Sequence, residues 1–174
     1  MSSPTDDNLL ATVYERLRGM ASRQLAGERT GHTLQPTALV HEVWLALQTQ
    51  MQELRDEPAR FYAAAAESMR RVLIDHARRR GAQKRGGGKK ALPLDLVEVA
   101  ATASLEELLE LDEAIEALAA VSERGAEVVR LRFYAGLGEA EVANVLGSSE
   151  RTIRREWAFA RAFLWQRLHG ESSA

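Results

Sequence analysis

Apolar residues recur every three or four positions along most of the chain, which is the period of an amphipathic helix. The helices that this period predicts in the first half cover residues 8–26, 36–50 and 58–80. In the second half it predicts one helix after Ser104, another after Ser122, and two more on either side of Gly147. The expected fold class is therefore all-α.

The segment from Gly136 to Trp157 has the pattern of a helix-turn-helix. Its short first helix ends at Gly147, a residue type that readily adopts the positive φ of a sharp turn. Ser149 is placed to cap the second helix, whose apolar positions continue at helical spacing. The outward positions of that helix are polar or basic: Arg151, Thr152, Arg154 and Arg155. A recognition helix offers such side chains to the major groove, so the pattern favours DNA binding over a plain helical hairpin with a solvated basic face.

A glycine-rich basic stretch separates the two halves of the chain. Glycine keeps such a stretch conformationally loose, which is typical of a linker between domains. The sequence Ser104-Leu-Glu-Glu then has the pattern of a capping box, which starts a new helix. We therefore expect two small helical domains, over residues 1–80 and 104–174, joined by a flexible basic linker over residues 81–103.

Composition places the chain among ordinary globular proteins. Its 174 residues are 45% hydrophobic and 28% charged, and they include no cysteine. No apolar run approaches the roughly 20 residues of a membrane span, and the N-terminus lacks the features of a signal peptide. Without cysteine there is neither a disulfide framework nor a thiolate metal site. The expected location is the cytoplasm, without membrane association.

Charge is strongly segregated although the net charge is only −2. The basic run comprises Arg70, Arg71, Arg78, Arg79, Arg80, Lys84, Arg85, Lys89 and Lys90. The acidic run comprises Asp95, Glu98, Glu106, Glu107, Glu110, Asp112, Glu113 and Glu116. The basic run suits a phosphate backbone, whereas a solvated helix end favoured by the macrodipole is the alternative. Basic elements in both halves favour a protein that touches DNA at two places.

Enzyme motifs in the sequence are incomplete. His41-Glu42 lacks the second histidine of a zinc protease, because Leu45 stands one turn later. Gly86-Gly-Gly-Lys-Lys lacks the spacing and the hydroxyl residue of a phosphate-binding loop. The four histidines show no metal-ligand spacing. We expect no enzymatic activity, no cofactor and no metal.

Three segments together resemble a bacterial extracytoplasmic-function (ECF) sigma factor of the two-domain minimal type. Residues 39–47 resemble the family's core-binding helix, and residues 61–80 resemble the helix that opens and reads the downstream promoter element. Residues 131–161 resemble the domain that reads the upstream element, and the resemblance spans roughly residues 8–168. The phrase from His32 to Glu42 is similar to that of a subgroup with a Gly-Gly-Gly linker.

The resemblance implies that the protein binds core RNA polymerase and promoter DNA. The implied polymerase-binding residues are Ala38, His41, Glu42 and Leu45. The loop 50–58 and the start of the next helix would hold a base flipped from the non-template strand. Phe61 and Tyr62 lie there and either stack on that base or belong to the core. The implied phosphate or base contacts are Arg70, Arg71, Arg78 and Arg79, with Arg151, Thr152, Arg154 and Arg155 reading the upstream element.

The chain departs from the family in its core-binding helix. Ala38 stands where the family usually carries aspartate, and Glu42 is the only acid in that stretch. Our hypothesis is that phosphorylation of Thr37, with Thr33 and Thr49 as weaker candidates, supplies the missing charge. A helix-capping role for Thr37 is the alternative. Candidate regulators are accordingly a Ser/Thr kinase or an anti-sigma protein.

Two other functional classes are compatible with parts of the sequence. A stand-alone helix-turn-helix regulator would share the C-terminal motif and would bind duplex DNA without polymerase, typically as a dimer on two half-sites. A regulatory protein that sequesters a partner through the acidic middle segment would leave both basic runs unexplained. The sigma-factor interpretation accounts for both halves of the chain.

Overall fold

The computed structural model describes residues 11, 14–15, 18–19, 36–48, 57–81 and 105–170. Within these ranges there are six complete helices and no strand, which confirms the all-α fold class. The helices are α2 (Pro36–Gln48), α4 (Pro58–Gly81), α6 (Leu105–Val121), α7 (Glu123–Phe133), α8 (Glu139–Val145) and α9 (Glu150–His169). Isolated positions between Ala11 and Gly19 are also helical.

Several predictions about loops lie outside the described residues. They concern the linker after Gly81, the loop over residues 50–56, and the candidate threonines Thr33 and Thr49. The division into domains therefore stays a prediction.

Local sequence explains where the C-terminal helices begin. The Ser122 hydroxyl accepts from the Gly125 amide at 3.1 Å and caps α7. The Ser149 hydroxyl accepts from the Thr152 amide at 3.2 Å and caps α9. Each cap satisfies a backbone donor that has no partner within its own helix. The predicted cap at Ser149 is confirmed, and the helix predicted after Ser122 begins at a cap formed by that serine.

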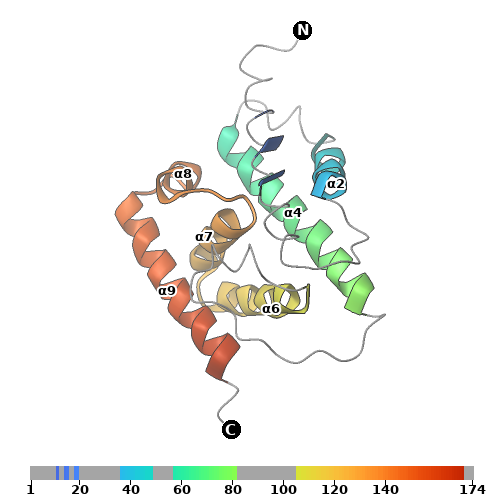
Figure 1. Ribbon diagram of the computed structural model, residues 1–174. Helices are drawn as coiled ribbons and strands as arrows, with labels where there is room; N and C mark the ends of the chain where they lie inside the picture. The colour runs from blue at the N-terminus through green and yellow to red at the C-terminus, as the bar shows by residue number, and fades with distance from the viewer. Residues whose placement is uncertain are drawn as a thin grey trace.

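One hydrophobic core draws residues from all six helices. Its largest fully buried side chains are Tyr134, Phe61, Leu39, Leu47, Met69, Leu73, Leu111, Ile115, Leu118, Ile153 and Leu164. Helix α4 packs against α2 on one side and against α6, α7 and α8 on the other (Figure 1). The segments predicted to form separate domains are thus in direct contact in this structure.

No described helix combines the length and the apolar character that crossing a bilayer requires.

Candidate nucleic-acid interface

A tight turn sets the position of α9 relative to α8. Gly147 adopts a left-handed backbone with φ of 56°, and the Ser148 amide donates to the Ala143 carbonyl at 2.8 Å. Ala143 and Ile153 are both buried beside this turn. A small residue at position 143 lets two helices approach closely, and glycine at 147 avoids the penalty that a side chain would meet at positive φ. These features fix the direction in which α9 leaves the turn.

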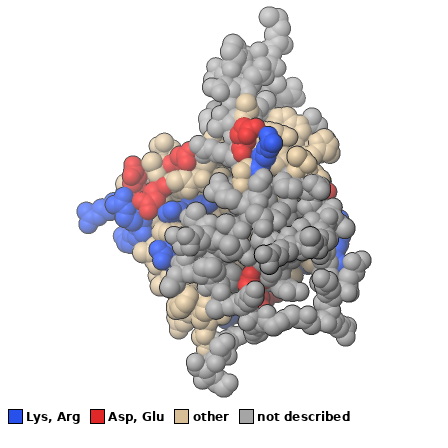
Figure 2. All heavy atoms as spheres, viewed as in Figure 1, with Lys and Arg blue, Asp and Glu red and all other residues tan. Residues whose placement is uncertain are grey.

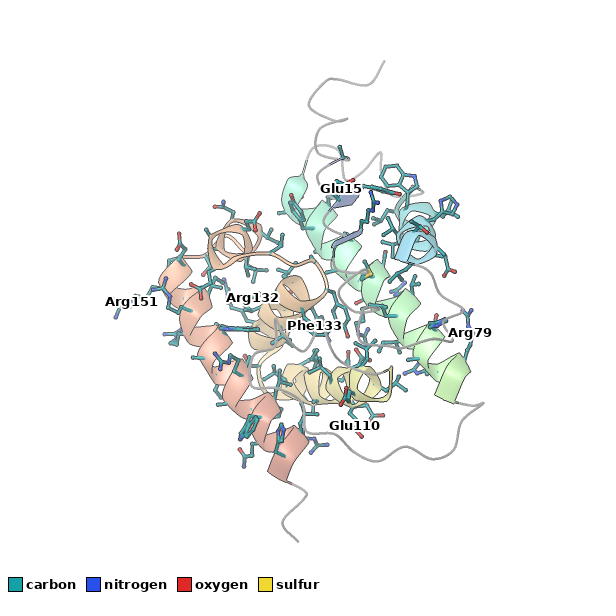
Figure 3. The ribbon with its side chains drawn as sticks, in the orientation of Figure 1. Glu15, Arg79, Glu110, Arg132, Phe133 and Arg151 are labelled. Carbon is teal, nitrogen blue, oxygen red and sulfur yellow. The ribbon has the colours of Figure 1, made fainter. Side chains whose placement is uncertain are left out.

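The first two turns of α9 carry three exposed arginines, at positions 151, 154 and 155. Arg151 projects away from the molecule at the start of the helix (Figure 3). Arginine side chains gather over this end of α9, beside acidic ones (Figure 2). Thr152 is half-buried, and its hydroxyl lies 3.0 Å from the Ser149 hydroxyl, which makes it part of the helix cap. The three arginines are therefore the side chains best placed to meet an external phosphate or base.

Two charged residues that the sequence did not single out hold α9 in place. The Arg132 guanidinium lies 4.1 Å from the centroid of the buried Trp157 ring, a cation–π contact between α7 and α9. Glu139 on α8 accepts from Arg132 at 3.4 Å and from Arg154 at 3.1 Å. Glu139 thus links α7, α8 and α9. Arg132 and Glu139 come from different helices, so helical spacing alone gave no signal for them.

The aromatic residues predicted to hold a flipped base lie at the start of α4. Phe61 is 1% exposed and belongs to the core, so its core alternative is the one that the structure shows. The Phe61 and Tyr62 rings meet edge to face with centroids 6.2 Å apart. Tyr62 is half-buried. Of this pair, Phe61 is buried and Tyr62 is partly exposed.

The arginines predicted on α4 have different surroundings. Arg78 and Arg79 are exposed near the end of the helix, where Arg79 can be seen in Figure 3. Arg71 is exposed and pairs with Glu67 one turn earlier, at 3.0 Å. Arg70 points instead toward α6, where it is held by acidic side chains. In this arrangement Arg70 has no free face for DNA, whereas the other three arginines do.

We call the residues around this contact the Arg70 cluster: Arg70, Asp112, Glu116, Arg130 and Tyr134. Arg70 donates to both oxygens of Asp112, from Nε at 2.6 Å and from Nη2 at 3.0 Å. Its Nη2 also lies 2.9 Å from Glu116, which accepts from Arg130 at 2.8 Å. The Tyr134 hydroxyl donates to Asp112 at 3.4 Å. The cluster ties α4 to α6, α7 and the residue after α7.

Protonation in the cluster is fixed by burial and pairing. The hydrogen bond to Asp112 raises the pKa of Arg70, which keeps the guanidinium charged. Burial, followed by the nearby charge of Asp112, raises the pKa of Tyr134, so its phenol stays a neutral donor. Asp112 is only 4% exposed. A buried carboxylate needs such partners, because leaving it unpaired costs several kcal/mol.

Helix α2 presents one buried face and one exposed face. Leu39, Val40, Val43 and Leu47 are fully buried against the rest of the protein. The predicted polymerase-binding residues Ala38, His41, Glu42 and Leu45 are all exposed, as is Thr37. Leu45 keeps 50% of its surface in solvent. The structure therefore brings the four predicted residues together on one accessible face.

Comparison with known families decides what this arrangement belongs to. The family model described as "ECF sigma factor" matches residues 3–170. The chain belongs to the ECF sigma factor family. No curated protein sequence and no solved structure gives a significant match.

Membership of the family defines the general activity. ECF sigma factors bind core RNA polymerase and promoter DNA and direct promoter-specific transcription initiation, and they are not enzymes. Within the described ranges, no group of three or more histidine or acidic side chains is arranged to hold a metal ion.

Proposed function

We propose that this ECF sigma factor docks on core RNA polymerase through the exposed face of α2. The observation that carries the proposal is the contrast between the two faces of this helix, one fully buried and one carrying an exposed Leu45. A single exposed apolar side chain is common on protein surfaces, so Leu45 supports docking because it shares this accessible face with Ala38, His41 and Glu42, the positions that the family resemblance assigns to polymerase binding. His41 and Glu42 flank Leu45 and would supply polar contacts at the rim.

We also propose separate DNA contacts for the two halves of the chain. The unit α8–turn–α9 would act as a helix-turn-helix that reads the upstream element with Arg151, Arg154 and Arg155. Thr152, whose hydroxyl belongs to the cap of α9, would contact DNA only at the first turn of that helix. Arg71, Arg78 and Arg79 on α4 would hold the backbone of the downstream element, with Tyr62 available for stacking on an unpaired base. Residues 1–80 and 104–174 would then be two domains joined by the linker 81–103, acting in the bacterial cytoplasm.

Phosphorylation of Thr37 is the proposed switch for polymerase binding. Thr37 is exposed in the first turn of α2, and that turn contains no acidic side chain. A phosphate in the first helical turn is stabilised by unpaired backbone amides and by the helix dipole. It would add negative charge beside Ala38, on the docking face. A Ser/Thr kinase is therefore the proposed regulator, with an anti-sigma protein as the alternative.

Run-off transcription with core polymerase on genomic fragments tests the function, alongside a gel shift with the protein alone. A sigma factor gives promoter-specific transcripts that require both components, with little shift by the free protein. Tight binding to duplex DNA without polymerase, and no initiation, would instead establish the stand-alone regulator.

The switch is tested by placing charge at adjacent positions of α2. Thr37→Asp should raise core binding and transcription above Thr37→Ala. Ala38→Asp in the Thr37→Ala background should bind core without any kinase, because it supplies the charge directly. Ala63→Asp adds the same charge at an exposed position of α4 and serves as the control. Equal core binding by Thr37→Asp and Thr37→Ala would refute the switch.

A further inference from the structure

The Arg70 cluster joins parts of the chain that the proposed function keeps separate. Arg70 lies on α4, whose arginines are proposed to bind the downstream element. Asp112 and Glu116 lie on α6, which precedes the proposed helix-turn-helix. The charge-assisted contacts between Arg70 and Asp112 thus connect residues 42 positions apart in the sequence.

All three guanidinium nitrogens of Arg70 are engaged within the protein. Nε and Nη2 donate to Asp112, Nη2 also donates to Glu116, and Nη1 lies 3.4 Å from Glu67. The Arg70 side chain is only 19% exposed. Carboxylates and phosphates bind the same planar donors of arginine. Arg70 therefore cannot hold a DNA phosphate while Asp112 and Glu116 hold it.

The pairing also makes the packing of α4 on α6 specific. Asp112 and Arg70 are stabilised together in the observed arrangement, whereas removal of either partner leaves a charge with little access to water. Both groups are well hydrated if α4 and α6 separate. When α4 packs on α6, the closed arrangement, Arg70 and Asp112 bind each other. When the two helices separate, the open arrangement, water or DNA takes the place of the partner.

We propose that the contact between Arg70 and Asp112 is an autoinhibitory latch. It holds α4 against the C-terminal helices and occupies a DNA-binding arginine with internal carboxylates, which take the place of phosphate. Opening of the latch separates α4 from α6 and frees Arg70 for the promoter. This inference rests on the proposed role of α4 in DNA binding.

The variants that test the latch change only α6, so the DNA-binding side chains stay intact. Asp112→Asn removes the charge and keeps an acceptor for Tyr134, and Glu116→Gln removes the second carboxylate. Glu113→Gln removes a charge from an exposed position of the same helix and is the matched control. Glu116→Gln alone is the variant to use if Asp112→Asn does not fold, because Glu116 is exposed.

The distance between α4 and α6 is measured directly in the full-length free protein. The chain has no cysteine, so Ala63→Cys on α4 and Ala120→Cys on α6 give two unique exposed sites for spin labels. Pulsed electron paramagnetic resonance should give one narrow distance distribution for the labelled protein with Asp112 and Glu116 intact. The labelled Glu113→Gln variant should give the same distribution. Asp112→Asn with Glu116→Gln should raise the longer-distance population by about tenfold or more, the factor that a hydrogen-bonded charge pair contributes.

Run-off transcription of the same proteins, each also carrying Thr37→Asp so that the proposed switch is on, provides the inhibitory readout. At limiting sigma factor, the double variant should initiate more often than the unmodified protein, and Glu113→Gln should not. Unchanged distances in a protein that transcribes would overturn the latch, and so would longer distances in a protein that transcribes without a gain in initiation. Silence of every variant in the Thr37→Asp background, with the distances still lengthened, would instead overturn the proposed function and leave the closed contact established.

Discussion

Gly147 offers a sharp test of the turn that orients α9, because there the penalty for a side chain arises from the backbone alone. Its φ is 56°, and no described atom lies within 4 Å of a Cβ built at this position. Gly147→Ala therefore meets no steric clash with neighbouring side chains. The left-handed conformation costs an L-residue roughly 1–2 kcal/mol. Reduced freedom of the unfolded chain offsets about 0.4–1 kcal/mol of that.

The expected net loss for Gly147→Ala is thus about 0–1.6 kcal/mol, centred near 0.8 kcal/mol, in the free energy of unfolding. Gly147→Asn should lose less than Gly147→Ala, because asparagine tolerates the left-handed region better. Gly147→Val should lose the most, since a β-branched residue is a strong outlier at positive φ. If Gly147 is left-handed, the loss of stability should therefore increase in the order Asn, Ala, Val.

Urea unfolding followed by far-ultraviolet circular dichroism measures this series. With a slope of about 1–3 kcal/mol per molar urea, a loss of about 1 kcal/mol lowers the midpoint by roughly 0.3–1 M. Gly170→Ala is the control, because Gly170 has an ordinary φ of −73° and a Cβ there would lie 3.8 Å from Gln166, which is normal contact. Equal stability of the Ala, Asn and Val variants would refute a left-handed turn at this position.

Three further predictions address the cap of α9, the DNA contacts and the polymerase surface. Ser149→Ala should lower the free energy of unfolding by about 1 kcal/mol, whereas Ser149→Asp should keep most of it, as measured by thermal denaturation. Arg151→Ala should weaken promoter binding by the holoenzyme. If Arg151 holds a phosphate, it should also reduce by about 1 the slope of the logarithm of the binding constant against the logarithm of salt concentration. Arg167→Ala, in the last turn of α9, should change neither the affinity nor the slope. Leu45→Ala should weaken core binding by about tenfold or more in a fluorescence anisotropy titration, while Val121→Ala, at an exposed apolar position of α6, should not. Equal losses for Arg151 and Arg167, or for Leu45 and Val121, would contradict these assignments.

The sequence was most informative where structure depends on neighbouring residues. Helices were predicted over residues 36–50 and 58–80, and they are observed over Pro36–Gln48 and Pro58–Gly81. Proline at a first helical position and serine at a cap act through adjacent backbone groups, so their effect can be predicted without the fold. The exposed face of α2 was equally predictable, because helical spacing assigns its buried and exposed sides.

Contacts between distant segments were not predictable in this way. Arg70 was assigned to a basic run because its neighbours in sequence are basic, yet its partners lie on α6. Helical spacing places Asp112 beside the buried Leu108 and Ile115 and puts Glu113 on the opposite side of α6. It does not show that α4 packs on this side of α6 and brings Arg70 to Asp112. Phe61 fits the apolar period of α4, but the sequence left it open between a DNA contact and the core, and its burial shows the core.

The segregated charge of the chain has a structural consequence that the net charge conceals. Part of the acidic run neutralises the basic helix internally, so the free protein presents less positive surface to DNA than its arginine content suggests. A substitution at Arg70 then has two opposed effects, since it removes a proposed DNA contact and also opens the latch. Substitutions at Asp112 and Glu116 have only the second effect. For that reason substitutions at Asp112 and Glu116, rather than at Arg70, distinguish the inhibitory role of the contact from the DNA-binding role of Arg70.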